Sequence, residues 1–85
     1  MERTRRLREM LEEQFLIEFD DELTGRSDLF KAGVIDSFGY VQLLGSIEQE
    51  FSIQLKDEDF LKNILTSLES IDAFVAAKIA ERDDR

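Results

Sequence analysis

Apolar residues recur at intervals of three and four along several stretches of the chain, which is the spacing of one face of an α-helix. The first stretch predicts a helix from about Thr4 to Phe15, with Thr4 as its cap. The second predicts a helix from Ser37 to about Glu50. The residues that form these two patterns are Leu7, Met10, Leu11 and Phe15, and then Leu43, Leu44, Ile47 and Phe51. We therefore expect two amphipathic helices.

The same spacing predicts a last helix near the C-terminus. Residues 66–69 read as a capping box, in which the hydroxyl of Thr66 is followed three residues later by Glu69. The apolar residues of this helix are Leu68, Ile71, Phe74, Val75 and Ile79, and its end at 81–85 should fray. A shorter helix of one or two turns is expected over 57–61, because acidic residues suit the first turn of a helix.

The segments between the helices carry fewer apolar residues. Ile17 and Phe19 alternate with charged residues, which suits a short extended stretch whose apolar side chains turn inward. Turn-forming and charged residues follow, so we predict a long loop attached to the core by Leu23, Leu29 and Phe30.

No repeat, proline or low-complexity tract divides the chain. We therefore expect one domain over residues 1–85, of the all-α class: a small four-helix bundle with a long loop between the first and second helices and a short third helix. The expected helix-face core comprises Leu11, Phe15, Leu43, Ile47, Phe51, Leu68, Ile71 and Phe74, whereas Gly39, Gln42, Ser46 and Gln49 of the second helix should face solvent.

The start of the second helix is the best candidate for a functional site. Asp36 and Ser37 both favour the N-cap position of a helix. A hydroxyl here lies among unpaired backbone N–H groups at the positive end of the helix dipole, so a phosphate ester on Ser37 would be electrostatically favoured. The simpler alternative is that the Asp-Ser pair only caps the helix.

Composition excludes several functions. The chain has no histidine and no cysteine, which removes catalysis by a histidine-activated serine and the usual soft metal ligands, so no enzyme activity and no metal site are expected. A formal net charge of −9 would repel nucleic acid and anionic membranes. No apolar run is long enough for a membrane span or a signal peptide, so we expect a cytoplasmic protein without membrane insertion.

The stretch from Asp28 to Phe60 resembles the acyl carrier protein family. The resemblance rests on the Asp-Ser-Phe-Gly motif at 36–39, the Val-Gln-Leu-Leu run at 41–44 and the Asp-Phe pair at 59–60, and it is closest to D-alanyl carrier proteins. It implies that Ser37, next to Asp36, carries a covalent 4'-phosphopantetheine arm. A separate phosphopantetheinyl transferase would transfer the arm from coenzyme A.

The resemblance also implies that the second helix is the docking face for partner enzymes. Residues 36–59 contain six acidic residues and one basic residue, a balance that would steer basic partners toward Ser37. On charge alone, solubility explains these acidic residues equally well. The implied partner-binding residues are Phe38, Val41, Gln42, Glu48, Glu50, Asp57, Glu58 and Asp59.

Three positions near Ser37 bear on the cargo. Gln42 stands where the family often has an acidic residue, and Gly45 stands where many fatty-acid carriers have a bulky residue such as methionine. Tyr40 could fold against the arm or cover the loop. A pocket for long acyl chains is therefore not expected, and we hypothesise a short acyl or aminoacyl group held outside the bundle.

Two functions remain open from the sequence. The leading one is a monomeric carrier that holds an acyl or aminoacyl group as a thioester and presents it to loading and transfer enzymes. The alternative is an unmodified acidic helical adaptor that binds partner proteins, in which Ser37 only contributes to a cap.

Overall fold

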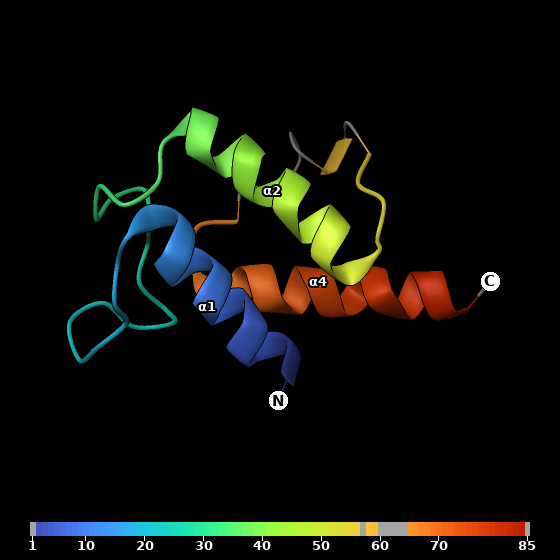
Figure 1. Ribbon diagram of the computed structural model, residues 1–85, viewed down its shortest axis with the longest axis horizontal. Helices are drawn as coiled ribbons and strands as arrows, with labels where there is room; N and C mark the ends of the chain where they lie inside the picture. Colours follow the sequence, from blue (N-terminus) through green and yellow to red (C-terminus); the bar gives the residue numbers. More distant parts are fainter. Residues whose placement is uncertain (1, 57, 60–64, 85) are drawn as a thin grey trace.

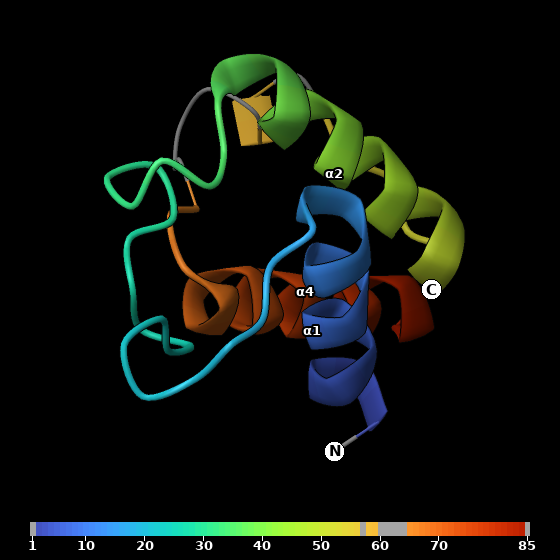
Figure 2. The ribbon, with the colours of Figure 1, turned by 60° about the vertical axis from the view of Figure 1, so that its left-hand side comes forward.

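The computed structural model describes residues 2–56, 58–59 and 65–84. Its helices are α1 (Glu2–Phe15), α2 (Ser37–Phe51) and α4 (Leu68–Asp83), and the described residues contain no strand, which confirms the all-α class. α1 packs against both α4 and α2, and Figures 1 and 2 show it crossing in front of α4 with α2 above. None of the described helices has the length and apolar character that a membrane crossing requires.

α1 begins earlier than predicted. Thr4 lies inside the helix rather than at its cap, and two ion pairs involve residues of the first turn. Nε of Arg3 lies 2.7 Å from Oδ1 of Asp72 in α4, and the guanidinium of Arg5 lies 2.6 Å from the Glu2 carboxylate. An acidic residue in the first turn also complements the helix dipole.

α2 begins at Ser37, as predicted, and ends at Phe51, one residue beyond the predicted end. It runs in the opposite direction to α1. Arg6 in the second turn of α1 pairs with Glu50 near the end of α2 at 3.1 Å, while Phe15 at the end of α1 lies close to Gly39 in the first turn of α2.

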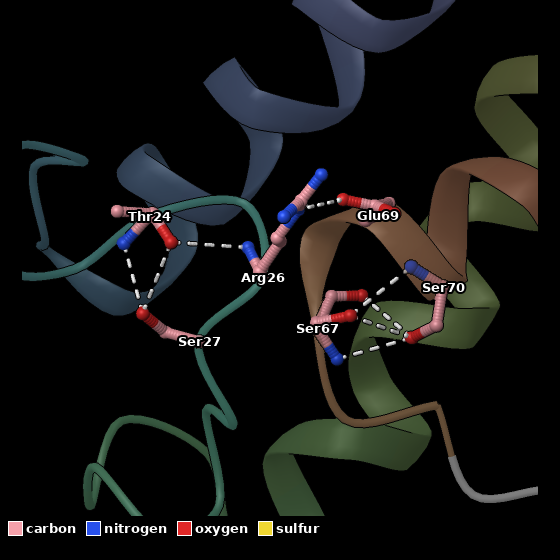
Figure 3. Close-up of polar contacts among 6 residues, drawn as sticks. All are labelled: Thr24, Arg26, Ser27, Ser67, Glu69 and Ser70. Atoms are coloured by element: carbon pink, nitrogen blue, oxygen red, sulfur yellow. Dashed lines mark hydrogen bonds and ion pairs between the residues drawn. The ribbon is translucent and has the colours of Figure 1, made fainter.

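α4 starts with a capping box that is displaced by one residue from the predicted one (Figure 3). Ser67, not Thr66, is the N-cap. Its Oγ accepts the N–H of Ser70 at 3.1 Å, and the Oγ of Ser70 accepts the N–H of Ser67 at 3.1 Å. Glu69 instead accepts a hydrogen bond from Arg26 of the loop at 3.2 Å. Thr66 and Ser67 are adjacent hydroxyl residues, and either could cap a helix. In the structure Ser67 is the cap.

The segment from 16 to 36 joins α1 to α2 through turns and bends and is tied to the start of α4. The N–H of Leu29 donates to the carbonyl of Thr66 at 2.7 Å, and the N–H of Glu69 donates to the carbonyl of Gly25 at 2.8 Å. Leu29 is fully buried, whereas Leu23 and Phe30 are partly buried. The three residues predicted to attach the loop therefore all pack against the core.

The predicted third helix falls mostly outside the described residues. Asp57 and residues 60–64 are among those not described, and Glu58 and Asp59 are helical. The four-helix count therefore stays a prediction.

The core is broader than the predicted set. Leu11, Leu43, Ile47, Leu68 and Ile71 are buried as expected, but Phe15, Phe51 and Phe74 are only partly buried. Leu44 and Val75, which belong to the predicted apolar patterns, are buried as well, and the buried apolar residues outside those patterns include Leu29, Ile35, Tyr40, Ile53 and Leu65. Several of these come from loops, where no helical period identifies a core side chain.

Candidate functional site

The candidate site lies at the junction between the loop and α2, where Asp36 is the N-cap. Asp36 has an extended backbone (φ −112°, ψ 178°), and its Oδ1 accepts the N–H of Gly39 at 2.7 Å. Its carbonyl accepts the N–H of Tyr40 at 2.9 Å. Asp36 therefore supplies the whole cap, and Ser37 occupies the first helical position.

Ser37 is consequently free of any capping role. Its side chain is exposed, and no hydrogen bond joins its hydroxyl to another described residue. The first N–H groups of a helix have no partner inside the helix and point toward this end. A phosphodiester can therefore be attached to Ser37 without breaking a bond of the fold, close to the positive end of the dipole.

Backbone hydrogen bonds to a buried residue hold the segment that leads into Ser37. The carbonyl of the fully buried Leu29 accepts hydrogen bonds from the N–H groups of Val34 at 2.9 Å and Ile35 at 3.2 Å. Ile35 is itself buried, and Gly33 makes the turn with a φ of +77°, which favours glycine. Ser37 is therefore presented by an anchored turn.

Gly39 is buried, contrary to the expectation that it faces solvent. A Cβ at this position would lie 2.9 Å from Cε1 of Phe15 and 3.2 Å from Oδ1 of Asp36. A side chain here would push against both the end of α1 and the cap. The glycine of the Asp-Ser-Phe-Gly motif thus permits close packing of α1 against the first turn of α2.

Tyr40 is also buried, with 6% of its surface exposed. Its ring packs at a tilt against Phe30, with 5.5 Å between the ring centroids, and its hydroxyl accepts the N–H of Leu65 at 3.0 Å. It fastens the start of α2 to the loop and to the segment before α4. Of the two roles considered for Tyr40, the structure shows the one that covers the loop.

Three of the predicted partner-binding residues gather next to Ser37. Phe38 is 71% exposed and Val41 is 57% exposed, and Gln42 is exposed beside them. Residues three and four apart lie on the same face of a helix, so these side chains form one surface. The structure therefore brings this part of the predicted docking face together.

The predicted acidic part of the docking face is used differently. Glu48 accepts the N–H of Leu55 at 2.8 Å, and Glu50 pairs with Arg6. Glu58 is exposed, and Asp57 lies outside the described residues. Helical spacing placed these carboxylates on a surface, but it could not reveal partners that lie far away in the sequence.

Asp59 is likewise engaged inside the molecule. It accepts the N–H of Lys56 at 2.8 Å and pairs with the Lys78 ammonium at 3.0 Å, where both side chains are 15% exposed. The backbone N–H of Lys56 and then the Lys78 ammonium lower the pKa of Asp59, and the same carboxylate raises the pKa of Lys78. Asp59 therefore fixes the segment after α2 to α4.

Gly45 lies on the surface in the middle of α2. A Cβ built on it meets no atom within 4 Å, so it does not border the core. It lines an open groove with Gln14 of α1 and with Gln42, Ser46, Glu48 and Gln49 of α2. Gly45 therefore does not lie on the inner side of α2, and its lack of a side chain is no evidence for or against an internal pocket for long acyl chains. Among the described residues, no group of His, Cys, Asp or Glu is arranged to hold a metal ion.

Comparison with known proteins agrees with this geometry. A family model described as a phosphopantetheine attachment site matches residues 5–77, and the chain therefore belongs to the family of phosphopantetheine carriers. A curated relative, the D-alanyl carrier protein of Streptococcus sanguinis (strain SK36), is 38% identical over 52 residues. The match covers 61% of this chain and 63% of the relative's length. No solved structure matches the chain significantly.

Membership of this family gives the protein a covalent 4'-phosphopantetheine prosthetic group. The group supplies a thiol that holds a carried group as a thioester. The free hydroxyl of Ser37 at the start of α2 fits such an attachment.

Proposed function

We propose that Ser37 carries the phosphopantetheine arm and that the protein presents a short acyl or aminoacyl group to partner enzymes. The observation that carries this proposal is the division of labour at the start of α2: Asp36 makes the cap, and the exposed Ser37 hydroxyl makes no hydrogen bond to a described residue. A serine needed only for capping would use its hydroxyl as Asp36 uses its carboxylate.

The protein itself contributes position rather than catalysis. The anchored turn before Ser37 and the close packing of Gly39 on Phe15 fix the position of Ser37 at this end of the molecule. The partners are a phosphopantetheinyl transferase and the enzymes that load and unload the arm. We expect the protein to act as a cytoplasmic monomer.

A small cargo is supported by the likeness to a D-alanyl carrier protein, because a short aminoacyl group needs no internal shelter. The inward-facing side chains of α2 are fully buried, among them Leu43, Leu44 and Ile47. A long chain entering between the helices would have to displace this packing. We therefore place the cargo at the solvated end of the arm.

Intact-mass measurement tests the attachment. Incubation with coenzyme A, magnesium and a broad-range phosphopantetheinyl transferase should raise the mass by one phosphopantetheine. Ser37→Ala should remain unmodified. Ser46→Ala is the matched control, because Ser46 is another exposed serine of α2, and it should be modified like the wild type. An unmodified wild type, or a modified Ser37→Ala, would refute the proposal.

Chemical shifts test the cargo. Arms on Ser37 loaded with an acetyl or an octanoyl group should give the same amide shifts along the inner faces of α2 and α4. Large shifts at Leu44 and Val75 for the octanoyl form alone, with a higher melting temperature, would show an internal pocket and contradict a small cargo.

A further inference from the structure

Leu16 is an exposed leucine in an unfavourable conformation. It directly follows α1, its φ is +55°, and 90% of its surface is exposed. The N–H of Ile17 donates to the carbonyl of Glu12 at 3.2 Å, which is the hydrogen bond of a Schellman motif. The left-handed residue of that motif is usually glycine, because a Cβ is disfavoured there. The fold therefore gains nothing from the leucine side chain.

The end of α2 offers a direct contrast. Ser52 has the same left-handed backbone, with a φ of +53°, and the N–H of Ile53 donates to the carbonyl of Glu48 at 3.2 Å. The two helices thus end in the same motif. One position carries a small polar residue, and the other carries a large apolar residue that meets solvent.

Leu16 lies at the end of the molecule that holds Ser37. Phe15, its neighbour, packs on Gly39, and Figures 1 and 2 both show the end of α1 beside the first half of α2. The large apolar side chains that are exposed in the described part of the chain are Leu16, Phe38 and Val41. All three therefore belong to the region where α1 ends and α2 begins.

The charge around Leu16 indicates which kind of partner fits. No lysine or arginine occurs between Arg8 and Arg26. The acidic residues in this interval whose side chains form neither an ion pair nor a hydrogen bond within the described residues are Glu13, Glu18, Asp21 and Glu22, whereas Asp20 accepts the N–H groups of Glu22 and Leu23. These carboxylates attract a basic surface, whereas Glu48, Glu50 and Asp59 are already engaged.

We propose that Leu16 is a docking residue that inserts into an apolar pocket, bordered by lysine or arginine, on the phosphopantetheinyl transferase that modifies Ser37. The inference rests on the proposed function. The transferase must approach Ser37, so it meets Phe38 and Val41, and Leu16 extends this contact from α2 onto the end of α1.

Binding measured apart from chemistry gives the test. A Ser37→Ala background cannot accept the arm, so its affinity for a broad-range phosphopantetheinyl transferase, measured by calorimetry with coenzyme A present, reports docking alone. Adding Leu16→Gly should weaken binding by about tenfold, since burial of one leucine is lost. The melting temperature should stay equal or rise, because glycine relieves the left-handed strain. A residue with a merely structural role would not weaken binding while preserving stability.

Ser52→Gly in the same background is the matched control. It makes the same backbone change at the other left-handed helix end and should leave the affinity unchanged. The dependence of affinity on salt should be equally steep with and without Leu16→Gly, because the leucine contributes an apolar contact and the carboxylates remain.

Three results would overturn the proposal: unchanged affinity in Leu16→Gly, an equal loss in Ser52→Gly, or an affinity that does not respond to salt. Failure of the proposed function is a separate result. It would appear as an unmodified wild type in the mass measurement, whereas docking is read from the unmodifiable background.

Discussion

At the start of α2, a single carboxylate makes the cap and leaves Ser37, Phe38 and Val41 open to solvent. At the end of α2, two carboxylates are engaged within the fold: Glu48 accepts the N–H of Leu55, and Glu50 pairs with Arg6. The first end thus exposes apolar side chains and a free hydroxyl, whereas carboxylates of the second end bind other parts of the molecule. The contrast teaches that the spacing of acidic residues on a helix face does not reveal which of them the fold already pairs.

Truncation of the core beneath α2 should have the largest effect. Ile47→Ala should lower the free energy of unfolding by about 2 to 5 kcal/mol, because the side chain is fully buried. Phe51→Ala should cost less, since Phe51 at the end of α2 is only partly buried. Urea unfolding monitored by circular dichroism measures both. An equal loss in the two variants would mean that the end of α2 packs as deeply as its middle.

Tyr40→Phe should weaken the attachment of the start of α2. The ring still packs on Phe30, but the N–H of Leu65 loses its acceptor in a buried position, which costs about 1 to 3 kcal/mol. Hydrogen exchange at the Leu65 amide should accelerate more than exchange within α1. If protection at Leu65 is unchanged, another group accepts this hydrogen bond.

Asp36→Ala should cost about 1 kcal/mol through loss of the N-cap. Ser37→Ala is the matched control and should stay within about 0.5 kcal/mol of the wild type, because its hydroxyl caps nothing. Thermal melts of the two variants compare the neighbouring positions. A larger loss for Ser37→Ala would reverse the assignment of cap and attachment residue.

Gly45→Ala, midway between the two ends, should stabilise the protein by about 0.5 to 1 kcal/mol. Glycine weakens a helix interior by this amount relative to alanine, and the added Cβ meets no atom within 4 Å. The melting temperature should rise while modification of Ser37 continues. A fall in melting temperature would place Gly45 against another part of the chain.

The smallest effect concerns the ion pair after α2. Asp59→Asn should cost up to about 1 kcal/mol near neutral pH. The folded protein lowers the pKa of Asp59, so the carboxylate stabilises fully above its unfolded value of 3.8 and loses this contribution as the pH falls through the folded value. The difference in stability between wild type and variant should therefore shrink below about pH 4. A difference that persists at pH 2 would assign it to packing.

Much of the site could be predicted from local sequence. The start of α2 followed from two capping residues and a helical period, both of which act within a few residues of Ser37. The roles of Gly39 and Tyr40 could not, because they depend on Phe15 and Leu65, each more than twenty residues away in the chain.

The contacts of the acidic residues within the fold could not be predicted either, for the same reason. The partner of Glu50 is Arg6 in another helix, and the partner of Asp59 is Lys78. Nothing in the spacing of acidic residues indicates which of them will be neutralised by tertiary contacts. The left-handed conformation of Leu16 could not be predicted from the sequence either, because leucine rarely adopts it.

The ion pair between Arg3 and Asp72 joins residues 69 positions apart, almost the full length of the chain. Closing so large a loop is entropically costly. The ion pair therefore stabilises the protein only after the elements between its two residues have formed. During synthesis, α1 leaves the ribosome long before α4 has been made. The part of its apolar face that packs on α4 therefore stays uncovered until then. This part of the fold can therefore form only after α4 has been made, and a nascent chain halted before Leu68 should expose to chaperones the part of α1 that packs on α4.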